Sequence, residues 1–335
     1  MKGIEKVHQL LESWVADKKI PGAVVDIRVG NQMKWQSAYG TATLDTIFDV
    51  ASLTKVAVTL PGIMMLVESS KLSLQDPVQK YIPEFRHAEV TIEHCLKHIS
   101  GLPAGIPDFE KRHSIVDAKQ QIFEMGLEAA PGERVNYSDL GFILLGWIIS
   151  RLTDQSLDEF AKETIYTPIG MKDSCFNPSQ DLHHRIAPTE WDGSKYILGE
   201  VHDETSYRLG GVAGSAGLFT TAEDLSKYAQ VWLYPEQYSL LTKETMEACR
   251  TSVFDGRGLG WQVQGSPGVT LSCGPHWPVG SFGHTGYTGT SLWINPVDKV
   301  SVVFLTNAVH YGRDSLNVFR ELRPILHEAV IAANL

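Results

Sequence analysis

The sequence predicts an α/β (α+β) fold, in which N- and C-terminal segments form one antiparallel sheet flanked by helices and enclose a mostly helical inserted subdomain. Strand patterns occur near both ends of the chain, helix patterns fill its middle, and 335 residues exceed a typical single core. We therefore expect a discontinuous sheet subdomain of residues 1–69 and 211–335 and a helical subdomain of residues 70–210.

The sheet is predicted to start close to the N-terminus. Residues 1–20 form an amphipathic, charged helix pattern. In residues 23–29 and 34–39, β-branched or aromatic residues alternate with polar ones, as expected for half-buried strands. Gly30 and Asn31 lie between them and are typical of a hairpin turn, so the two strands should be antiparallel.

A helix is predicted over residues 52–69, where Val56, Leu60, Ile63 and further apolar residues recur at helical spacing. The pair at 61–62, proline followed by glycine, should kink or interrupt it. The pattern places Ser52 at the N-terminus of this helix.

The middle and the end of the chain complete the prediction. Helix patterns separated by Pro- and Gly-rich turns include residues 140–152 and 157–166. Strand patterns return at residues 260–264, 289–295 and 300–307, the last two forming a hairpin, and a final helix covers about 315–332.

Composition limits the function. The chain has 39 acidic and 29 basic residues, a formal net charge of -10, and no visible run of Lys and Arg, which argues against binding of nucleic acid. Residues 1–20 lack the uninterrupted apolar run of a signal peptide, and we find no apolar stretch of transmembrane length. We expect a small-molecule or peptide substrate.

The four cysteines, at positions 95, 175, 249 and 273, are widely spaced and form no C-x-x-C pattern. Reduced thiols of a cytoplasmic protein fit this spacing better than a disulfide framework. We therefore expect a cytoplasmic location for the sequence as it stands, or an extracellular or cell-envelope location if an export signal has been removed.

Ser52 and Lys55 form the candidate catalytic pair. They are three residues apart on the predicted helix, so the amine can reach the hydroxyl. A serine hydroxyl needs a neighbouring base, and a lysine can serve when burial or nearby positive charge lowers its pKa. Ser-x-x-Lys alone is a weak signal, but Tyr137-Ser138-Asp139 and His284-Thr285-Gly286 follow it.

The order of these three motifs resembles that of the serine penicillin-binding protein and class C β-lactamase superfamily. Residues 98–103 (HISGLP) and the Gly-rich residues 210–221 resemble further family segments, so the resemblance covers nearly the whole chain. Residues 201–204 (VHDE) resemble a subgroup that contains low-activity penicillin-binding proteins and muropeptide amidases.

The resemblance implies a β-lactamase/DD-peptidase-like fold with an active-site cleft between its two subdomains, and it implies roles for single residues. Ser52 would attack a carbonyl carbon, while Lys55 and Tyr137 share proton transfer. The oxyanion would lie between the backbone N–H groups of Ser52 and of Tyr287, on an edge strand. The substrate would contact four residues: Asp139, His284, Thr285 and Gly286.

Two residues depart from the family pattern. Asp139 replaces the usual Asn, so a side-chain donor to the substrate is lost, and its carboxylate should raise the pKa of Lys55. His284 replaces the Lys of most β-lactamases, although some D-alanyl-D-alanine peptidases of the family also carry His. We expect this histidine to be partly charged at neutral pH and to bind a substrate carboxylate weakly.

Other kinds of site are less well supported. His94 and His98 have helical i, i+4 spacing, but Cys95 replaces the glutamate of H-E-x-x-H. Ser215 lacks the G-x-S-x-G pattern, and the Gly-rich residues 256–260 lack the strand of a dinucleotide site. We expect neither a metal nor a cofactor.

The sequence thus predicts a serine hydrolase that forms an acyl-enzyme on Ser52 and acts on peptidoglycan-type D-amino-acid peptides or amides. This is the activity of a D-alanyl-D-alanine carboxypeptidase, with β-lactams and small esters as weak substrates. Two alternatives stay open. One is a catalytically slow penicillin-binding or sensor protein, and the other is a carboxylesterase of the same fold.

Overall fold

The structure is a computed structural model that describes residues 2–30, 33–107, 112–114, 116–266, 268 and 270–332. Asn31 of the predicted hairpin turn lies outside these residues. The strands are β1 (Gly22–Val29), β2 (Met33–Gly40), β3 (Phe48–Asp49), β4 (Phe219–Thr220), β5 (Gln262–Val263), β6 (Phe282–Thr285), β7 (Ser291–Asn295) and β8 (Val300–Thr306).

The α-helices are α1 (Lys2–Ala16), α2 (Leu60–Glu68), α3 (Ile92–Leu96), α4 (Ala118–Glu124), α5 (Asp139–Thr153), α6 (Leu157–Ala161), α7 (Thr167–Ile169), α8 (Glu204–Arg208), α9 (Ala222–Leu233), α10 (Lys243–Thr251) and α11 (Ser315–Ile331). π-helical turns cover Lys55–Thr59 and Lys162–Tyr166. Short 3-10 helices cover Val78–Lys80, Gln180–Arg185, Pro235–Gln237 and Ala308–Tyr311.

N- and C-terminal segments share one sheet, as predicted. Its order is β2-β1-β8-β7-β6-β5, and every pair of neighbours is antiparallel. The N-terminal strand β1 pairs with β8 from Ala23 opposite Thr306 to Val29 opposite Val300. The fold class is therefore confirmed.

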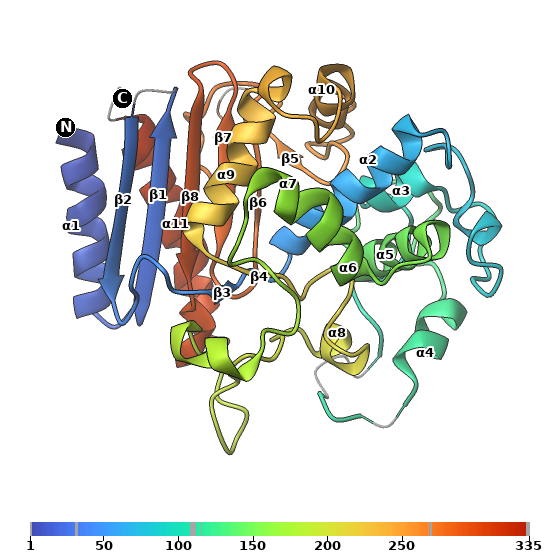
Figure 1. Ribbon diagram of the computed structural model, residues 1–335, viewed down its shortest axis with the longest axis horizontal. Helices are drawn as coiled ribbons and strands as arrows, with labels where there is room; N and C mark the ends of the chain where they lie inside the picture. Colours follow the sequence, from blue (N-terminus) through green and yellow to red (C-terminus); the bar gives the residue numbers. More distant parts are fainter. Residues whose placement is uncertain are drawn as a thin grey trace.

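Helices cover both faces of the sheet, with α9 in front and α11 behind in Figure 1. Behind the sheet, α1 and α11 pack together over buried side chains that include Val25, Ile27 and Phe304. In front, Val24 joins the large core that continues into the helical part of the molecule. Successive residues of β1 thus face opposite layers, as the strand period requires.

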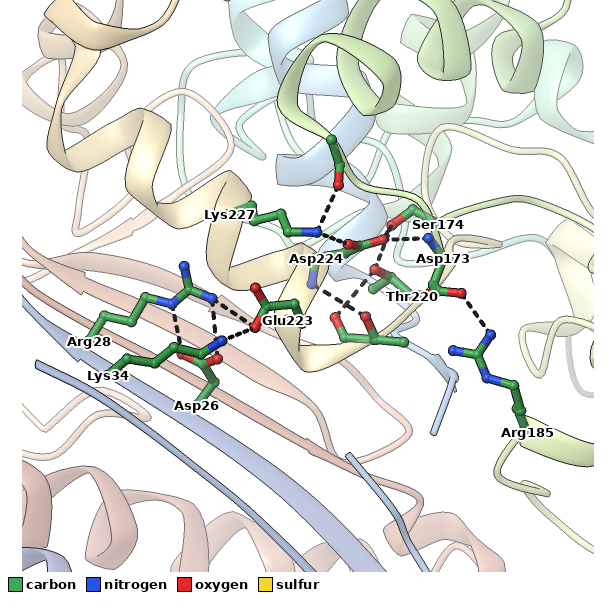
Figure 2. Close-up of polar contacts among 12 residues, drawn as sticks. Asp26, Arg28, Lys34, Asp173, Ser174, Arg185, Thr220, Glu223, Asp224 and Lys227 are labelled. Carbon is green, nitrogen blue, oxygen red and sulfur yellow. Dashed lines mark hydrogen bonds and ion pairs between the residues drawn. The ribbon is translucent and has the colours of Figure 1, made fainter. Parts of the chain in front are cut away.

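A charged network ties β1 and β2 to α9 (Figure 2). Asp26 is fully buried, and its carboxylate accepts from Arg28 at 3.0 Å. Glu223 of α9 pairs with Arg28 at 3.1 Å and with Lys34 at 2.5 Å. Burial raises the pKa of Asp26, against the opposing effect of Arg28. The network fixes the position of α9 on the sheet.

The middle of the chain is mostly helical around one apolar core. The backbone of α2 lies close to α5, because a Cβ on Gly62 would meet Ile149 Cδ1 at 2.7 Å. An interruption was predicted at residues 61–62, but α2 continues through both of them. The irregular part of this helical segment is the π-helical turn Lys55–Thr59, directly before α2. The division into two subdomains stays a prediction.

Three strands were not predicted. β6 contains Gly283 and His284, which carry no strand pattern, and it is positioned by pairing with β7. β3 and β4 are two residues each and pair only with one another. The predicted strand 260–264 is reduced to Gln262–Val263, which forms the edge of the sheet beside β6.

Candidate active site

Ser52 lies in a tight turn between β3 and the first π-helical turn. The preceding residue, Ala51, has a φ of 48°, which is unfavourable for a residue with a Cβ. Its N–H donates to Asp49 Oδ1 at 2.8 Å, and Thr54 Oγ1 donates to its carbonyl at 2.7 Å. Asp49 Oδ2 accepts the N–H of His202 at 2.6 Å, so a single buried carboxylate links the serine turn to the opposite loop.

Lys55 is fully buried beside Ser52. Its Nζ donates to Ser52 Oγ at 2.9 Å and to the carbonyl of Ser215 at 2.9 Å, and it lies 2.5 Å from Asp139 Oδ1. Burial lowers the pKa of Lys55, but the charge of Asp139 and the contact with Tyr137 together raise it above its ordinary value. The direction of this shift agrees with the expected effect of Asp139 and favours the ammonium form of resting Lys55.

Tyr137 is held next to this pair by His98. The two rings stack with centroids 4.3 Å apart, and His98 Nδ1 accepts the N–H of Ser138 at 3.1 Å. Ser138 caps α5, which starts at Asp139. Lys55 Nζ lies 5.1 Å from the Tyr137 ring centroid, so the second motif meets the first as predicted.

His284 is buried on β6, with 2 % of its surface exposed. Its Nδ1 contacts the carbonyl of Thr285 at 2.8 Å and must donate there, so Nε2 is an acceptor, and it has no partner among the described residues. Burial and the charges of Arg257 and Lys55 hold the pKa of His284 well below its ordinary value. The expectation of a partly charged imidazole at neutral pH is therefore wrong, because it ignored burial.

The turn after β6 packs against residues 49 and 50, directly before the turn that carries Ser52. Thr288 Oγ1 donates to the carbonyl of Asp49 at 2.7 Å, and Thr290 Oγ1 donates to that of Val50 at 3.1 Å. At Gly286 a Cβ would lie 2.3 Å from the carbonyl oxygen of Val50, so only glycine fits.

The two N–H groups predicted to form the oxyanion hole belong to this arrangement. Within the described chain, neither the N–H of Ser52 nor that of Tyr287 donates to a protein acceptor, and both residues line the same pocket. Tyr287 lies in the turn after β6 rather than on an edge strand, since the edge strands of the large sheet are β2 and β5. The oxyanion role stays a prediction.

The pocket at Ser52 has a volume of about 290 Å³ and a mainly apolar wall that includes three acidic residues. Asp139, Asp203 and Glu204 line it, and burial together with Asp139 raises the pKa of Asp203 to about 6. Arg313 also lines it but is paired with Glu190 at 2.9 Å and with Glu204.

Several residues of the site were missed or assigned differently. Asp49 and Arg257 belong to no predicted motif, because their partners are distant in the sequence. Asp203 lies in the segment 201–204 that resembles a family subgroup, but no role in the site was predicted for it. His94 Nδ1 accepts the N–H of Thr91 in the cap of α3, and the described residues contain no group of three or more side chains suited to a metal ion. No helix among them is long and apolar enough to cross a membrane.

Known proteins resemble this chain in sequence and in fold. The family model described as Beta-lactamase matches residues 7–324. A relative from Salmonella agona (strain SL483), named "Putative D-alanyl-D-alanine carboxypeptidase", is 31% identical and covers 91% of this chain and 83% of its own length.

Solved structures show the same fold. A class C beta lactamase superposes with a TM-score of 0.76 at 22% identity, over 98% of both chains. The octameric penicillin-binding protein homologue from Pyrococcus abyssi superposes with a TM-score of 0.73 at 23% identity, over 96% of this chain and 78% of its own.

Proposed function

The chain belongs to the beta-lactamase family and is a serine hydrolase, and we propose that it cleaves peptidoglycan-type peptides or amides built from D-amino acids through an acyl-enzyme on Ser52. The single observation that carries the proposal is the 2.9 Å contact between Ser52 Oγ and the buried Lys55 Nζ. An amine in this position can take the hydroxyl proton when it is neutral.

The residues around this contact support a complete acyl transfer. Ser52 Oγ forms a bond to the substrate carbonyl carbon while its proton passes to neutral Lys55, either directly or through the hydroxyl of Tyr137, and the N–H groups of Ser52 and Tyr287 stabilise the oxyanion. The C–N bond then breaks, and the leaving amine takes that proton. Water hydrolyses the ester on Ser52, giving a carboxylic acid and the free serine.

The substrate class rests on similarity and on the shape of the site. The Salmonella relative carries D-alanyl-D-alanine carboxypeptidase in its name and aligns with most of this chain. A peptide strand would lie along β6, contacting His284, Thr285 and Gly286 on one side of Ser52 and Asp139 on the other. The pocket volume of about 290 Å³ is close to the lower end of the range for small-molecule sites.

D-Alanine release tests this substrate class. We would incubate the protein with N-acetyl-L-lysyl-D-alanyl-D-alanine and with the isomer that ends in L-alanine, and measure the free amino acid. Release of D-alanine from the first peptide alone, absent in Ser52→Ala, is the expected result. Equal release from both peptides, or release that persists in Ser52→Ala, would contradict the proposal.

A slow penicillin-binding protein is the second candidate, and the Lys55–Asp139 ion pair favours it. An ammonium ion cannot accept a proton, so only the small neutral fraction of Lys55 can activate Ser52. A slow protein would bind one equivalent of fluorescent penicillin and release it over hours. A carboxylesterase of the same fold would instead turn over p-nitrophenyl acetate steadily and leave the peptide intact.

The location of the protein is part of the proposal. All four cysteines lie among the described residues and none forms a disulfide. Burial raises the pKa of the Cys95 and Cys249 thiols to about 12, so they are unreactive. Free thiols support a reducing compartment, which is the cytoplasm.

A further inference from the structure

Arg323 is a buried cation of α11, the helix that packs behind the sheet (Figure 1). The residue is 7% exposed, and no carboxylate among the described residues pairs with its guanidinium. Burial and the charge of Arg320 lower the pKa of Arg323 to about 9, so the guanidinium is still charged at neutral pH. A buried charge without a counter-ion is costly, so its position calls for a physical explanation.

The guanidinium of Arg323 is bonded to the backbone of the turn after β6. Its Nη2 donates to the carbonyl oxygen of Gly286 at 3.2 Å, and within the described chain the side chain makes no other hydrogen bond. Nε is buried without a partner there, and Cζ lies 4.8 Å from the ring centroid of Phe319, one turn earlier on α11. The side chain is therefore directed at a single peptide group.

Gly286 and Tyr287 share that peptide group. The described chain contains no cis peptide bond, and in a trans peptide the carbonyl and the N–H point in opposite directions. The carbonyl oxygen of Gly286 faces Arg323 and also accepts the N–H of Gly289 at 3.2 Å. The N–H of Tyr287 must therefore point away from Arg323. It donates to no acceptor among the described residues, and Tyr287 lines the pocket at Ser52.

The orientation of this peptide group needs support. Gly286 has no Cβ, so rotation about its backbone bonds is less hindered than in other residues. A rotated peptide would turn the carbonyl oxygen of Gly286 toward the pocket in place of the N–H of Tyr287, and that oxygen would repel an oxyanion. The hydrogen bond from Arg323 opposes this rotation. A cation at the carbonyl oxygen also polarises the peptide group, which makes its N–H a stronger donor.

We propose that Arg323 is a positioning residue of the oxyanion hole, which fixes the peptide between Gly286 and Tyr287 so that the N–H of Tyr287 donates to the oxyanion. The inference rests on the proposed function, in which the oxyanion forms when Ser52 attacks the substrate. Arg323 does not line the pocket at Ser52. It therefore acts through Tyr287 and without contact to the substrate.

A comparison of an ester with its thionoester tests the proposal. We would measure kcat/KM for p-nitrophenyl acetate and for p-nitrophenyl thionoacetate, in which sulfur replaces the carbonyl oxygen. Sulfur is a weak hydrogen-bond acceptor, so a correctly placed N–H accelerates the reaction of the ester more than that of the thionoester. In Arg323→Met the N–H is present but less well placed, so the ester-to-thionoester ratio should fall about 10- to 100-fold, less than for loss of a whole donor. Arg323→Lys should retain part of the ratio.

The control is Arg320→Met. Arg320 is an exposed residue of the same helix, and its charge acts on both Arg323 and Tyr287, but within the described chain it makes no hydrogen bond to Gly286. The same loss of charge should therefore leave the ratio unchanged. Arg323→Gln, which is uncharged and shorter, repeats the test if Arg323→Met does not fold. Far-ultraviolet circular dichroism and the unfolding midpoint show which variants are folded.

Three results would overturn the proposal. One is equal slowing of the ester and the thionoester in the folded Arg323 variant, which would leave Arg323 with a structural role only. Another is hydrolysis of both at the wild-type rates, and the third is an equal fall of the ratio in Arg320→Met. Failure of the proposed function would show differently, as hydrolysis of p-nitrophenyl acetate that persists in folded Ser52→Ala. The inference would then fail as well, because Arg323 would have no oxyanion to support.

Discussion

Asp49→Asn tests whether one buried carboxylate holds the nucleophile in its reactive position. The carboxylate accepts two backbone N–H groups, from Ala51 at 2.8 Å and from His202 at 2.6 Å, and the residue is 2% exposed. An asparagine offers one acceptor oxygen and places an NH₂ group against the second N–H. That N–H loses its acceptor, which costs about 1–3 kcal/mol for a buried group.

The hydrogen bond that is lost in Asp49→Asn also helps to hold Ser52 in position. A left-handed φ at a residue with a Cβ costs about 1–3 kcal/mol, and at Ala51 the surrounding hydrogen bonds offset this cost. If the turn relaxes in the variant, the reactive population of Ser52 falls about tenfold for each 1.4 kcal/mol lost. We expect acylation by a fluorophosphonate probe to slow by about 10- to 100-fold.

Asp26→Asn is the matched control. Asp26 is also a fully buried aspartate, but it pairs with Arg28 (Figure 2) and does not line the pocket at Ser52. Both variants should lose stability in urea unfolding, whereas only Asp49→Asn should slow probe labelling. The reasoning would be refuted if the probe labelled folded Asp49→Asn at the wild-type rate. It would also be refuted if labelling slowed equally in both variants.

Three further predictions concern proton transfer and charge. Tyr137→Phe keeps the stack on His98 but removes the hydroxyl, so acylation should slow by about 10²- to 10⁴-fold, and an unchanged rate would exclude Tyr137 from proton transfer. Asp139→Asn removes the charge that raises the pKa of Lys55, so the acidic limb of the acylation pH profile should move to lower pH; movement to higher pH would contradict this. Asp203 has its pKa raised from 3.8 to about 6, so the folded protein retains a proton that the unfolded chain loses, and stability falls as pH rises through this window. Asn at this position can still cap α8 but does not titrate, so Asp203→Asn should remove up to about 3 kcal/mol of the pH-dependent loss in the free energy of unfolding. If urea unfolding of the variant between pH 4 and 7 has the same pH dependence as that of the wild type, the role given to Asp203 is wrong.

Local patterns made the contact between Ser52 and Lys55 and most of the sheet predictable. Ser52 and Lys55 are three residues apart in the turn that leads into the helical segment, where the N–H of Lys55 donates to the carbonyl of Ser52 at 3.1 Å, so the contact of their side chains is local. β1 and β2 follow one another in the sequence, with Val29 opposite Met33, so their pairing is also local. β6 escaped prediction because its pairing with β7 rather than its own composition makes it a strand.

The remaining features of the site depend on contacts between distant segments. Asp49 and His202 are far apart in the sequence, and Arg257 meets Tyr137 only after the chain has folded. The charge of His284 depends on how deeply β6 is buried, which its motif does not indicate. The effect of Asp139 on Lys55 was predictable because the family motifs place both residues at one site.

Mapping the acylated residue tests the central claim most directly. We would treat the protein separately with fluorescent penicillin and with p-nitrophenyl acetate, measure the intact mass, and locate the modification by peptide mapping. The account predicts one adduct per chain on Ser52 with at least one of the two reagents, and none in folded Ser52→Ala. An adduct on another residue, an adduct that persists in Ser52→Ala, or no modification of Ser52 by either reagent would contradict it.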